Sequence, residues 1–289
     1  MPQTSAIGQH AARGKSWMLP EASSEDLIYA TGGCGGTCVL SYPQGKVVGT
    51  LDTLGAAVCS DAQGSVFILH FGSAIEYAHG GTTPIATLSL TGAGSGCSVD
   101  PTSNNLAVVF GNGRLAVFAN ESGSPTMYST GLSTGYCGYD NAGNLFVSGY
   151  NGGAGAIAEL PYGQQAFNIL SVSGTLGSPG QMQWDGSHMT YENRTRGVAD
   201  ISVSQLSISG SVASVIGTTS LNGGNIRYAW QSWIYKGNLL LPYGRKDEKV
   251  NKLGLWRYPN GGNPKRAFKL ADSGNWSFYG VTVSVAPSR

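Results

Sequence analysis

A short phrase recurs four times along the chain, and this repeat constrains the fold more than any other feature. Each copy has an aspartate, then a turn, and then an apolar run, as in "DNAGNLFV" at 140–147. The four aspartates are Asp61, Asp100, Asp140 and Asp185, so that successive copies are 39, 40 and 45 residues apart. A period of about 40–45 residues is typical of the four-stranded blades of β-propellers.

Each repeat contains four short runs that are predicted to be strands. In one copy these are "TGYCGY" before Asp140, and "LFVSGY", "AIAELPYG" and "FNILSV" after it. Glycine supplies 44 of the 289 residues, which suits short strands joined by tight turns. Aspartate favours the first position of such turns because its carboxylate accepts backbone N–H bonds. We therefore expect the four aspartates to cap turns rather than to carry out chemistry.

The two ends of the chain are incomplete in complementary ways. "DLIYATG", "TCVLSYPQG" and "VVGTLD" near the N-terminus supply three strands of a unit without its first strand, whereas "FYGVTVSVAP" near the C-terminus is typical of a first strand alone. We expect residues 280–285 to pair with residues 27–32. This pairing would close a ring, which leaves no exposed sheet edge.

The predicted fold class is all-β, a six-bladed β-propeller of four-stranded antiparallel blades closed by the C-terminal strand. Residues 1–25 are expected to be an N-terminal tail or linker, and residues 26–289 a single propeller domain. A β-sandwich or an open β-solenoid is the alternative, but sandwich strands lack a four-strand period. Hydrophobic residues make up 41% of the chain, which is enough for a sizeable core.

Charge and hydropathy exclude two classes of partner. The net charge is +1 and no basic stripe is present, so we expect no nucleic-acid partner. No apolar run approaches the roughly 18 residues of a membrane-spanning helix. The N-terminal residues are polar and lack the apolar region of a signal peptide, so we expect any leader to be absent from this chain. We expect a monomer.

Several motifs resemble those of a known family. "DAQGSVFI" and "DNAGNLFV" resemble NHL-repeat β-propellers, over about residues 26–285. "LSYPQGKVVGTL", "IEYAHGGTTPIATL" and "GCSVDPTSNNLAV" are similar to a group of uncharacterised secreted bacterial propeller proteins. The resemblance implies an exported six-bladed propeller in an extracellular or periplasmic location. It implies no chemistry, because propellers include lactonases, lyases, sugar binders and scaffolds.

The five cysteines fall into two groups. Cys34 and Cys38 flank a glycine-rich loop without the further ligands that zinc needs, so a disulfide is expected in an exported protein. Cys59 and Cys97 lie on opposite faces of neighbouring first strands and could approach each other across two blades. The alternative, which we favour, is that these two and Cys137 are buried thiols.

Candidate binding residues gather on one face of the predicted ring. The loops from second to third strands and those between repeats share this face. Its aromatic and basic candidates are His70, Tyr136, Tyr191, Arg194, Arg196, Arg227, Tyr243, Trp276 and Tyr279. Aromatic rings with arginine donors suit a sugar, an aromatic compound or an anionic small molecule, although such rings also cap cores. The predicted function is that of an exported binding or scaffold protein that recognises a small molecule or a partner protein, without a cofactor.

The alternative function is catalytic. A lyase or a lactonase or esterase-type hydrolase would hold a divalent cation such as Ca²⁺ at the mouth of the central channel. The candidate ligands are Glu192, Asn193 and Asn225. No nucleophile elbow, phosphate loop or HExxH motif occurs in the sequence, so no catalytic residue is assigned.

Overall fold

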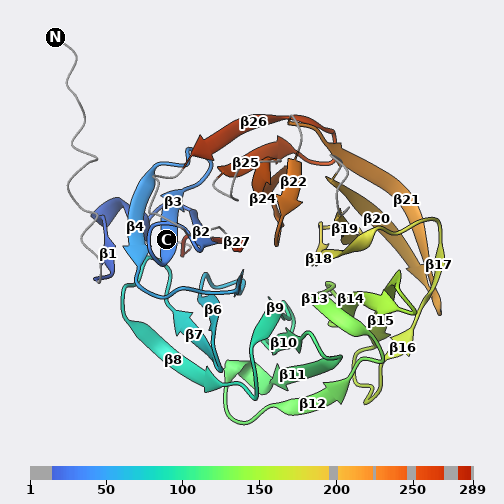
Figure 1. The fold of residues 1–289 in the computed structure, drawn as a ribbon. Helices are drawn as coiled ribbons and strands as arrows, with labels where there is room; N and C mark the ends of the chain where they lie inside the picture. Colours follow the sequence, from blue (N-terminus) through green and yellow to red (C-terminus); the bar gives the residue numbers. More distant parts are fainter. Residues whose placement is uncertain (1–14, 195–200, 224–225, 246–251, 270–278, 288–289) are drawn as a thin grey trace.

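The computed structural model describes residues 15–194, 201–223, 226–245, 252–269 and 279–287. Within these residues the chain is almost entirely β-structure, with two short 3₁₀ helices, η1 (Pro20–Ser23) and η2 (Ala119–Glu121). Figure 1 shows the strands gathered into sheets that follow one another around a common centre in the order of the sequence. The expectation of an all-β fold built from four-stranded antiparallel sheets is confirmed.

Three consecutive sheets follow the predicted repeat. Sheet B consists of β5 (Ala57–Ser60), β6 (Val66–His70), β7 (Ser73–Tyr77) and β8 (Pro84–Ser89). Sheet C consists of β9 (Gly94–Val99), β10 (Leu106–Phe110), β11 (Arg114–Phe118) and β12 (Thr126–Ser129). Sheet D consists of β13 (Ser133–Tyr139), β14 (Leu145–Asn151), β15 (Ala154–Leu160) and β16 (Asn168–Ile169). Each strand pairs antiparallel with the next one in the sequence, so every sheet is a meander.

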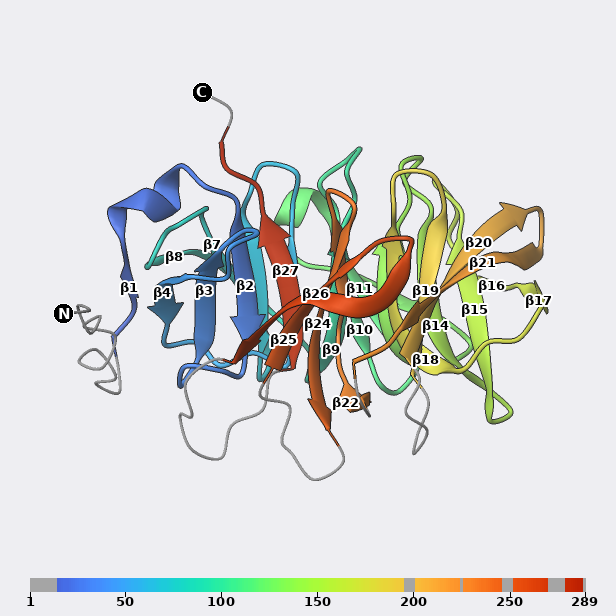
Figure 2. The same ribbon diagram turned by 90° about the horizontal axis from the view of Figure 1, so that it is seen from above.

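Sheet A combines both ends of the chain. Its strands are β1 (Trp17–Met18), β4 (Val47–Leu51), β3 (Thr37–Ser41), β2 (Leu27–Thr31) and β27 (Gly280–Ser284), in that spatial order. β27 pairs antiparallel with β2 from Thr31↔Gly280 to Leu27↔Ser284, and Figure 2 shows the two arrows running in opposite directions. The pairing expected between these two segments is therefore present. Residues 17–23, within the segment expected to precede the domain, form β1 and η1 against this sheet.

The last two sheets are less regular. Sheet E contains β18 (Ser178–Trp184), β19 (Met189–Arg194), β20 (Ile201–Ser209) and β21 (Val212–Leu221), with β17 (Ser171–Ser173) parallel to β21. Sheet F contains β22 (Ile226–Ala229), β23 (Trp233–Tyr235), β24 (Asn238–Arg245), β25 (Lys252–Arg257) and β26 (Gly261–Lys269). One pair, Leu221↔Gly262, connects β21 to β26. The sheets are thus not identical copies of one blade.

Two predicted strands are divided in the structure. The fourth strand of sheet D stops after the two residues of β16, and the chain crosses to sheet E as β17. The first strand of sheet F is broken between β22 and β23, so that residues 230–232 pair with no strand.

The core lies between neighbouring sheets. The strands nearest the centre contact one another in turn, from β27 through β5, β9, β13 and β18 to β23, and β23 contacts β27. One core cluster joins Ile28 and Leu40 of sheet A to Leu240 and Leu253 of sheet F, which are distant in the sequence. Each sheet thus buries apolar side chains on both faces against its two neighbours.

The cysteines form two disulfides. Cys34–Cys38 is present as predicted, and its Cα atoms are 5.4 Å apart. Cys59 of β5 and Cys97 of β9 also form a disulfide, so the favoured expectation that both are free thiols is wrong. Cys137 remains a buried thiol, and burial raises its pKa. Two disulfides are typical of an oxidising compartment such as the periplasm or the cell exterior. No helix in the described part of the chain is long and apolar enough to cross a membrane.

The repeated aspartates cap the turns between first and second strands, as expected. In each turn a carboxylate oxygen accepts a hydrogen bond from the backbone N–H of the residue two positions later, at 2.9–3.0 Å. The Asp185 carboxylate also accepts bonds from Gln205 of β20 and Tyr258 at the end of β25, which links sheets E and F.

Candidate functional site

Residues 230–232, between β22 and β23, contact three other sheets. The Trp230 ring packs edge-on against Tyr279, which precedes β27 of sheet A. The Gln231 side chain bonds to Val58 of sheet B, and Ser232 bonds to Glu192 of sheet E. Because these residues have left the β-ladder, their side chains and backbone are available for contacts that a regular first strand could not make.

Gln231 is fully buried, and its side-chain amide pairs with the backbone of Val58 as a neighbouring strand would. Its Oε1 accepts a hydrogen bond from the Val58 N–H at 3.1 Å, and its Nε2 donates one to the Val58 carbonyl oxygen at 2.6 Å. The side chain passes the start of β27, where a Cβ on Gly280 would lie 2.6 Å from the Gln231 Oε1. Any larger residue at position 280 would displace the Gln231 amide from this position. Gln231 thus connects sheets F, A and B.

A second glutamine makes the same kind of connection one sheet away. Gln183 of β18 donates from Nε2 to the Ile234 carbonyl oxygen at 2.8 Å and accepts the Ile234 N–H bond at 2.7 Å. Sheet E is joined in this way to β23 of sheet F. Glutamine amides thus replace the regular backbone bonds on both sides of the broken first strand.

Replacing Gln231 by Leu should lower the free energy of unfolding by about 3 kcal/mol, because the substitution leaves the buried N–H and C=O groups of Val58 without partners. Urea denaturation followed by circular dichroism measures this loss. Gln164 is exposed, and its replacement by Leu serves as the matched control, with an unchanged midpoint. Equal midpoints for the two variants would contradict the role assigned to Gln231.

Glu192 lies on β19 and faces Ser232, with 1% of its surface exposed. Its Oε2 accepts bonds from the Ser232 N–H at 3.1 Å and from the Ser232 hydroxyl at 2.6 Å. Its Oε1 is buried and has no hydrogen-bond partner among the described residues. Burial raises the pKa of Glu192, and Arg194 and the Ser232 bonds oppose that rise. Gly180 leaves room for this carboxylate, since a Cβ there would lie 2.8 Å from the Glu192 Cβ.

Arg194 lies two residues further along β19 and contacts two aromatic rings. Its Nε donates to the Pro179 carbonyl oxygen at 2.7 Å, and its Nη1 donates to the Tyr136 hydroxyl at 3.3 Å. The guanidinium carbon lies 4.9 Å from the centre of the Tyr136 ring and 6.0 Å from that of Trp230. A cation between ring faces is stabilised by their negative electrostatic potential.

Tyr136, Arg194, Trp230 and Tyr279 together form what we call the aromatic–arginine row. Tyr136 is buried at one end, whereas Trp230 is 37% exposed. The Tyr279 N–H donates to the carbonyl oxygen of Thr31, the last residue of β2. The row therefore lies at the end of the sheets where second strands turn into third strands, the face predicted to bind a ligand.

The other predicted binding residues whose side chains the structure describes are not part of this row. Tyr191 and Tyr243 are buried in cores between sheets, and His70 of sheet B bonds through Nδ1 to the Leu54 carbonyl oxygen. Arg196, Trp276 and the metal candidate Asn225 lie outside the described residues, as does the side chain of Arg227. The row therefore includes Tyr136, Arg194 and Tyr279 of the predicted set.

The two described metal candidates lie on opposite faces of β19. The Asn193 amide donates to the Ser202 and Ser204 hydroxyls and accepts the Gly177 N–H bond, so its hydrogen-bonding capacity is used within sheet E. Glu192, the preceding residue, faces sheet F instead. Among the residues that the structure describes, no group of three or more His, Cys, Asp and Glu side chains is placed to hold a metal ion.

The sequence prediction missed Trp230, Gln231 and Ser232. A signal was present in "AWQSW" at 229–233, where two polar residues interrupt the first strand of the last repeat. The same repeat has Tyr235 where the other copies have an aspartate.

Comparisons with known proteins identify the fold only. Neither a known family profile nor a curated protein sequence matches the chain. A protein of unknown function from Bacteroides caccae has a similar structure, with a TM-score of 0.66 and 12% identity over 90% of this chain and 99% of that one. Hydrazine synthase from Kuenenia stuttgartiensis matches with a TM-score of 0.54 and 11% identity over 71% of this chain, which spans 63% of that chain. These matches do not confirm the resemblance to NHL repeats.

Proposed function

We propose that this protein is an exported six-bladed β-propeller that binds a small molecule at the aromatic–arginine row. The pairing of β2 with β27 and the contacts among the innermost strands support a closed ring. The two disulfides fit an exported protein. The observation that carries the binding function is the partly exposed Trp230 ring beside the Arg194 guanidinium, near the centre of the ring.

The chemistry of the row favours a ring-containing anion as the ligand. The Trp230 face offers an apolar platform for a sugar or aromatic ring, and Arg194 supplies positive charge. Arg194 is held by Pro179 and Tyr136 before any ligand arrives. This preorganisation reduces the entropy lost on binding, because the longest side chain of the site is already ordered.

Binding to anionic ring compounds should depend on Trp230. We expect titration calorimetry with a panel of sugar acids and aromatic carboxylates, starting with glucuronate and 4-hydroxybenzoate, to find at least one ligand. Trp230→Ala should weaken that ligand about tenfold, which corresponds to about 1.4 kcal/mol of lost contact. Its melting temperature should stay close to that of the unmodified protein, since the ring is partly exposed.

Tyr162 provides the matched control, because its ring is 67% exposed and lies on the β15–β16 connection of sheet D. Tyr162→Ala should leave the affinity unchanged. An unchanged affinity in Trp230→Ala, or failure of the whole panel to bind, would overturn the proposed site.

A further inference from the structure

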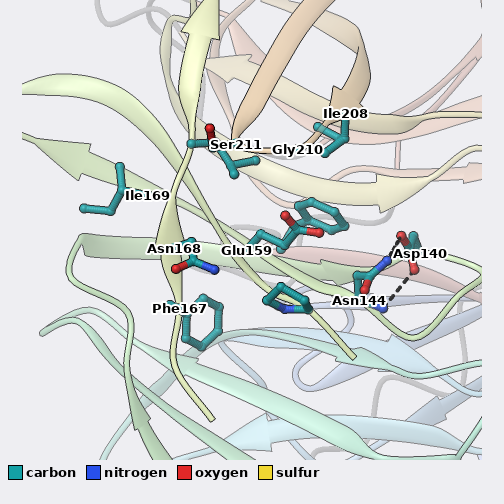
Figure 3. Close-up of a pocket in the computed structure, with 12 residues that line it drawn as sticks. Asp140, Asn144, Glu159, Phe167, Asn168, Ile169, Ile208, Gly210 and Ser211 are labelled. Atoms are coloured by element: carbon teal, nitrogen blue, oxygen red, sulfur yellow. Dashed lines mark hydrogen bonds between the residues drawn. The ribbon is translucent and has the colours of Figure 1, made fainter. Parts of the chain in front are cut away.

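A second concave feature lies between sheets D and E, on the outer side of β14 and β15. Because β16 has only two residues and β17 pairs with β21, the chain crosses from one sheet to the next without a full fourth strand. A cavity of about 940 Å³ remains at this crossing. Figure 3 shows its lining, which comes from the β13–β14 turn, β14, β15, the β16 segment, and the end of β20 with its turn into β21.

The cavity has an apolar wall and an acidic centre. The apolar lining includes Phe146, Phe167, Leu170 and Ile208, and the acidic residues are Asp140 and Glu159. In Figure 3, Glu159 lies between Asn168 on one side and the Asp140–Asn144 pair on the other. The described residues that line this cavity include no Lys, Arg or His. The site therefore carries negative charge without a basic counterpart of its own.

The two acidic side chains differ in how they are bonded. Asp140 accepts bonds from the backbone N–H groups of Ala142 and Asn144 and from the Asn144 side-chain amide. No described residue donates a hydrogen bond to the Glu159 carboxylate, whose pKa is raised by burial and by the Asp140 charge. A cation at Glu159 would restore the interactions that the carboxylate loses on leaving water.

Sheet B contains the same pair of acids beside a longer fourth strand. Glu76 on β7 lies opposite Phe67, as Glu159 on β15 lies opposite Phe146, and each glutamate is close to the turn aspartate of its own sheet. Glu76 is buried, which raises its pKa while the Ser65 side chain opposes the rise, and its sheet keeps a six-residue fourth strand, β8. The repeat thus supplies an internal comparison in which the equivalent glutamate is buried beside a longer fourth strand.

From this contrast we propose that the cavity between sheets D and E binds a small organic ammonium compound with an apolar body. The ammonium group donates to the Glu159 carboxylate, and the apolar body packs against Phe146, Phe167 and Ile208. This site is separate from the aromatic–arginine row and takes a ligand of opposite charge.

The test uses two probes that share a phenyl ring and differ in charge, 2-phenylethylamine and 3-phenylpropionate. We expect titration calorimetry on the full chain to detect the amine and not the acid. Glu159→Gln should weaken amine binding about tenfold, because a charge-assisted hydrogen bond becomes a neutral one. Glu76→Gln, the matched change in sheet B, should leave amine binding unchanged.

A second measurement locates the probe. In NMR spectra, the amine should shift the signals of Ile208 and leave the indole signal of Trp230 in place. Equal binding of amine and acid, unchanged amine affinity in Glu159→Gln, absence of amine binding, or a shift at Trp230 instead of Ile208 would each overturn the proposal. Because Glu159→Gln keeps the side-chain volume, thermal melting should show that the variant is folded.

Discussion

A chain that ends at residue 279 should lose its cooperative unfolding transition. The deletion removes β27, which pairs with β2 along its whole length. It also removes Val281 and Val283, which are buried in the core between sheets A and F. Burying each valine contributes about 1.5–3 kcal/mol, and a domain of this kind has only about 5–15 kcal/mol of net stability.

Polar contacts of β27 add to this loss. The Thr282 hydroxyl hydrogen-bonds with the Ser60 hydroxyl of sheet B at 2.9 Å, and the Ser284 hydroxyl donates to the Gly64 carbonyl oxygen. β27 therefore lies where three sheets meet. Its removal also exposes the edge of β2, which becomes available for pairing between molecules.

Differential scanning calorimetry and near-ultraviolet circular dichroism measure the change. A chain that ends at residue 287 is the control and should melt like the full chain. A sharp transition of the 279-residue chain near the temperature of the full chain would contradict the closed ring.

Loss of the Cys59–Cys97 disulfide should have the second largest effect. This bond joins the first strands of sheets B and C across a sequence separation of 38 residues. In the loop-entropy account, a crosslink of this span stabilises the folded chain by about 4 kcal/mol. The variant Cys59→Ala/Cys97→Ala should therefore unfold at a much lower urea concentration.

The other disulfide provides the matched control. Cys34–Cys38 spans a separation of four residues, for which the same account gives only about 2 kcal/mol. Cys34→Ala/Cys38→Ala should therefore lose less stability. Thiol titration of the unmodified protein in denaturant without reductant should find one thiol, from Cys137. A count of three thiols would contradict the Cys59–Cys97 bond. Equal losses of stability in the two double variants would contradict the larger stabilisation assigned to that bond.

Much of the architecture could be predicted because its causes are local in the sequence. Alternating apolar runs and turns led by aspartate fix where strands begin and end, and Asp61, Asp100, Asp140 and Asp185 cap their turns as expected. The complementary ends of the chain were sufficient to predict the pairing of β2 with β27. The Cys34–Cys38 disulfide could also be predicted, because the two residues are only four positions apart in the sequence.

The candidate site was predicted only in part. The face and three members of the row, Tyr136, Arg194 and Tyr279, followed from the order of strands and loops. Tyr191 and Tyr243 could not be distinguished from them by sequence, because strand-end tyrosines either line a mouth or fill a core. The orientation of each ring depends on the neighbouring sheet, and the rings of these two tyrosines pack in the hydrophobic core between sheets.

The sequence by itself determined the repeating unit, its turns and the complementary ends. Only the tertiary structure decided where the repeat fails. The break at residues 230–232 brings Trp230, Gln231 and Ser232 to three different sheets, and the short β16 opens the cavity at Glu159. The Cys59–Cys97 bond likewise depends on a Cα separation of 5.7 Å between two sheets. Such distances arise from side-chain packing between segments far apart in the chain, and a local pattern of residues does not encode them.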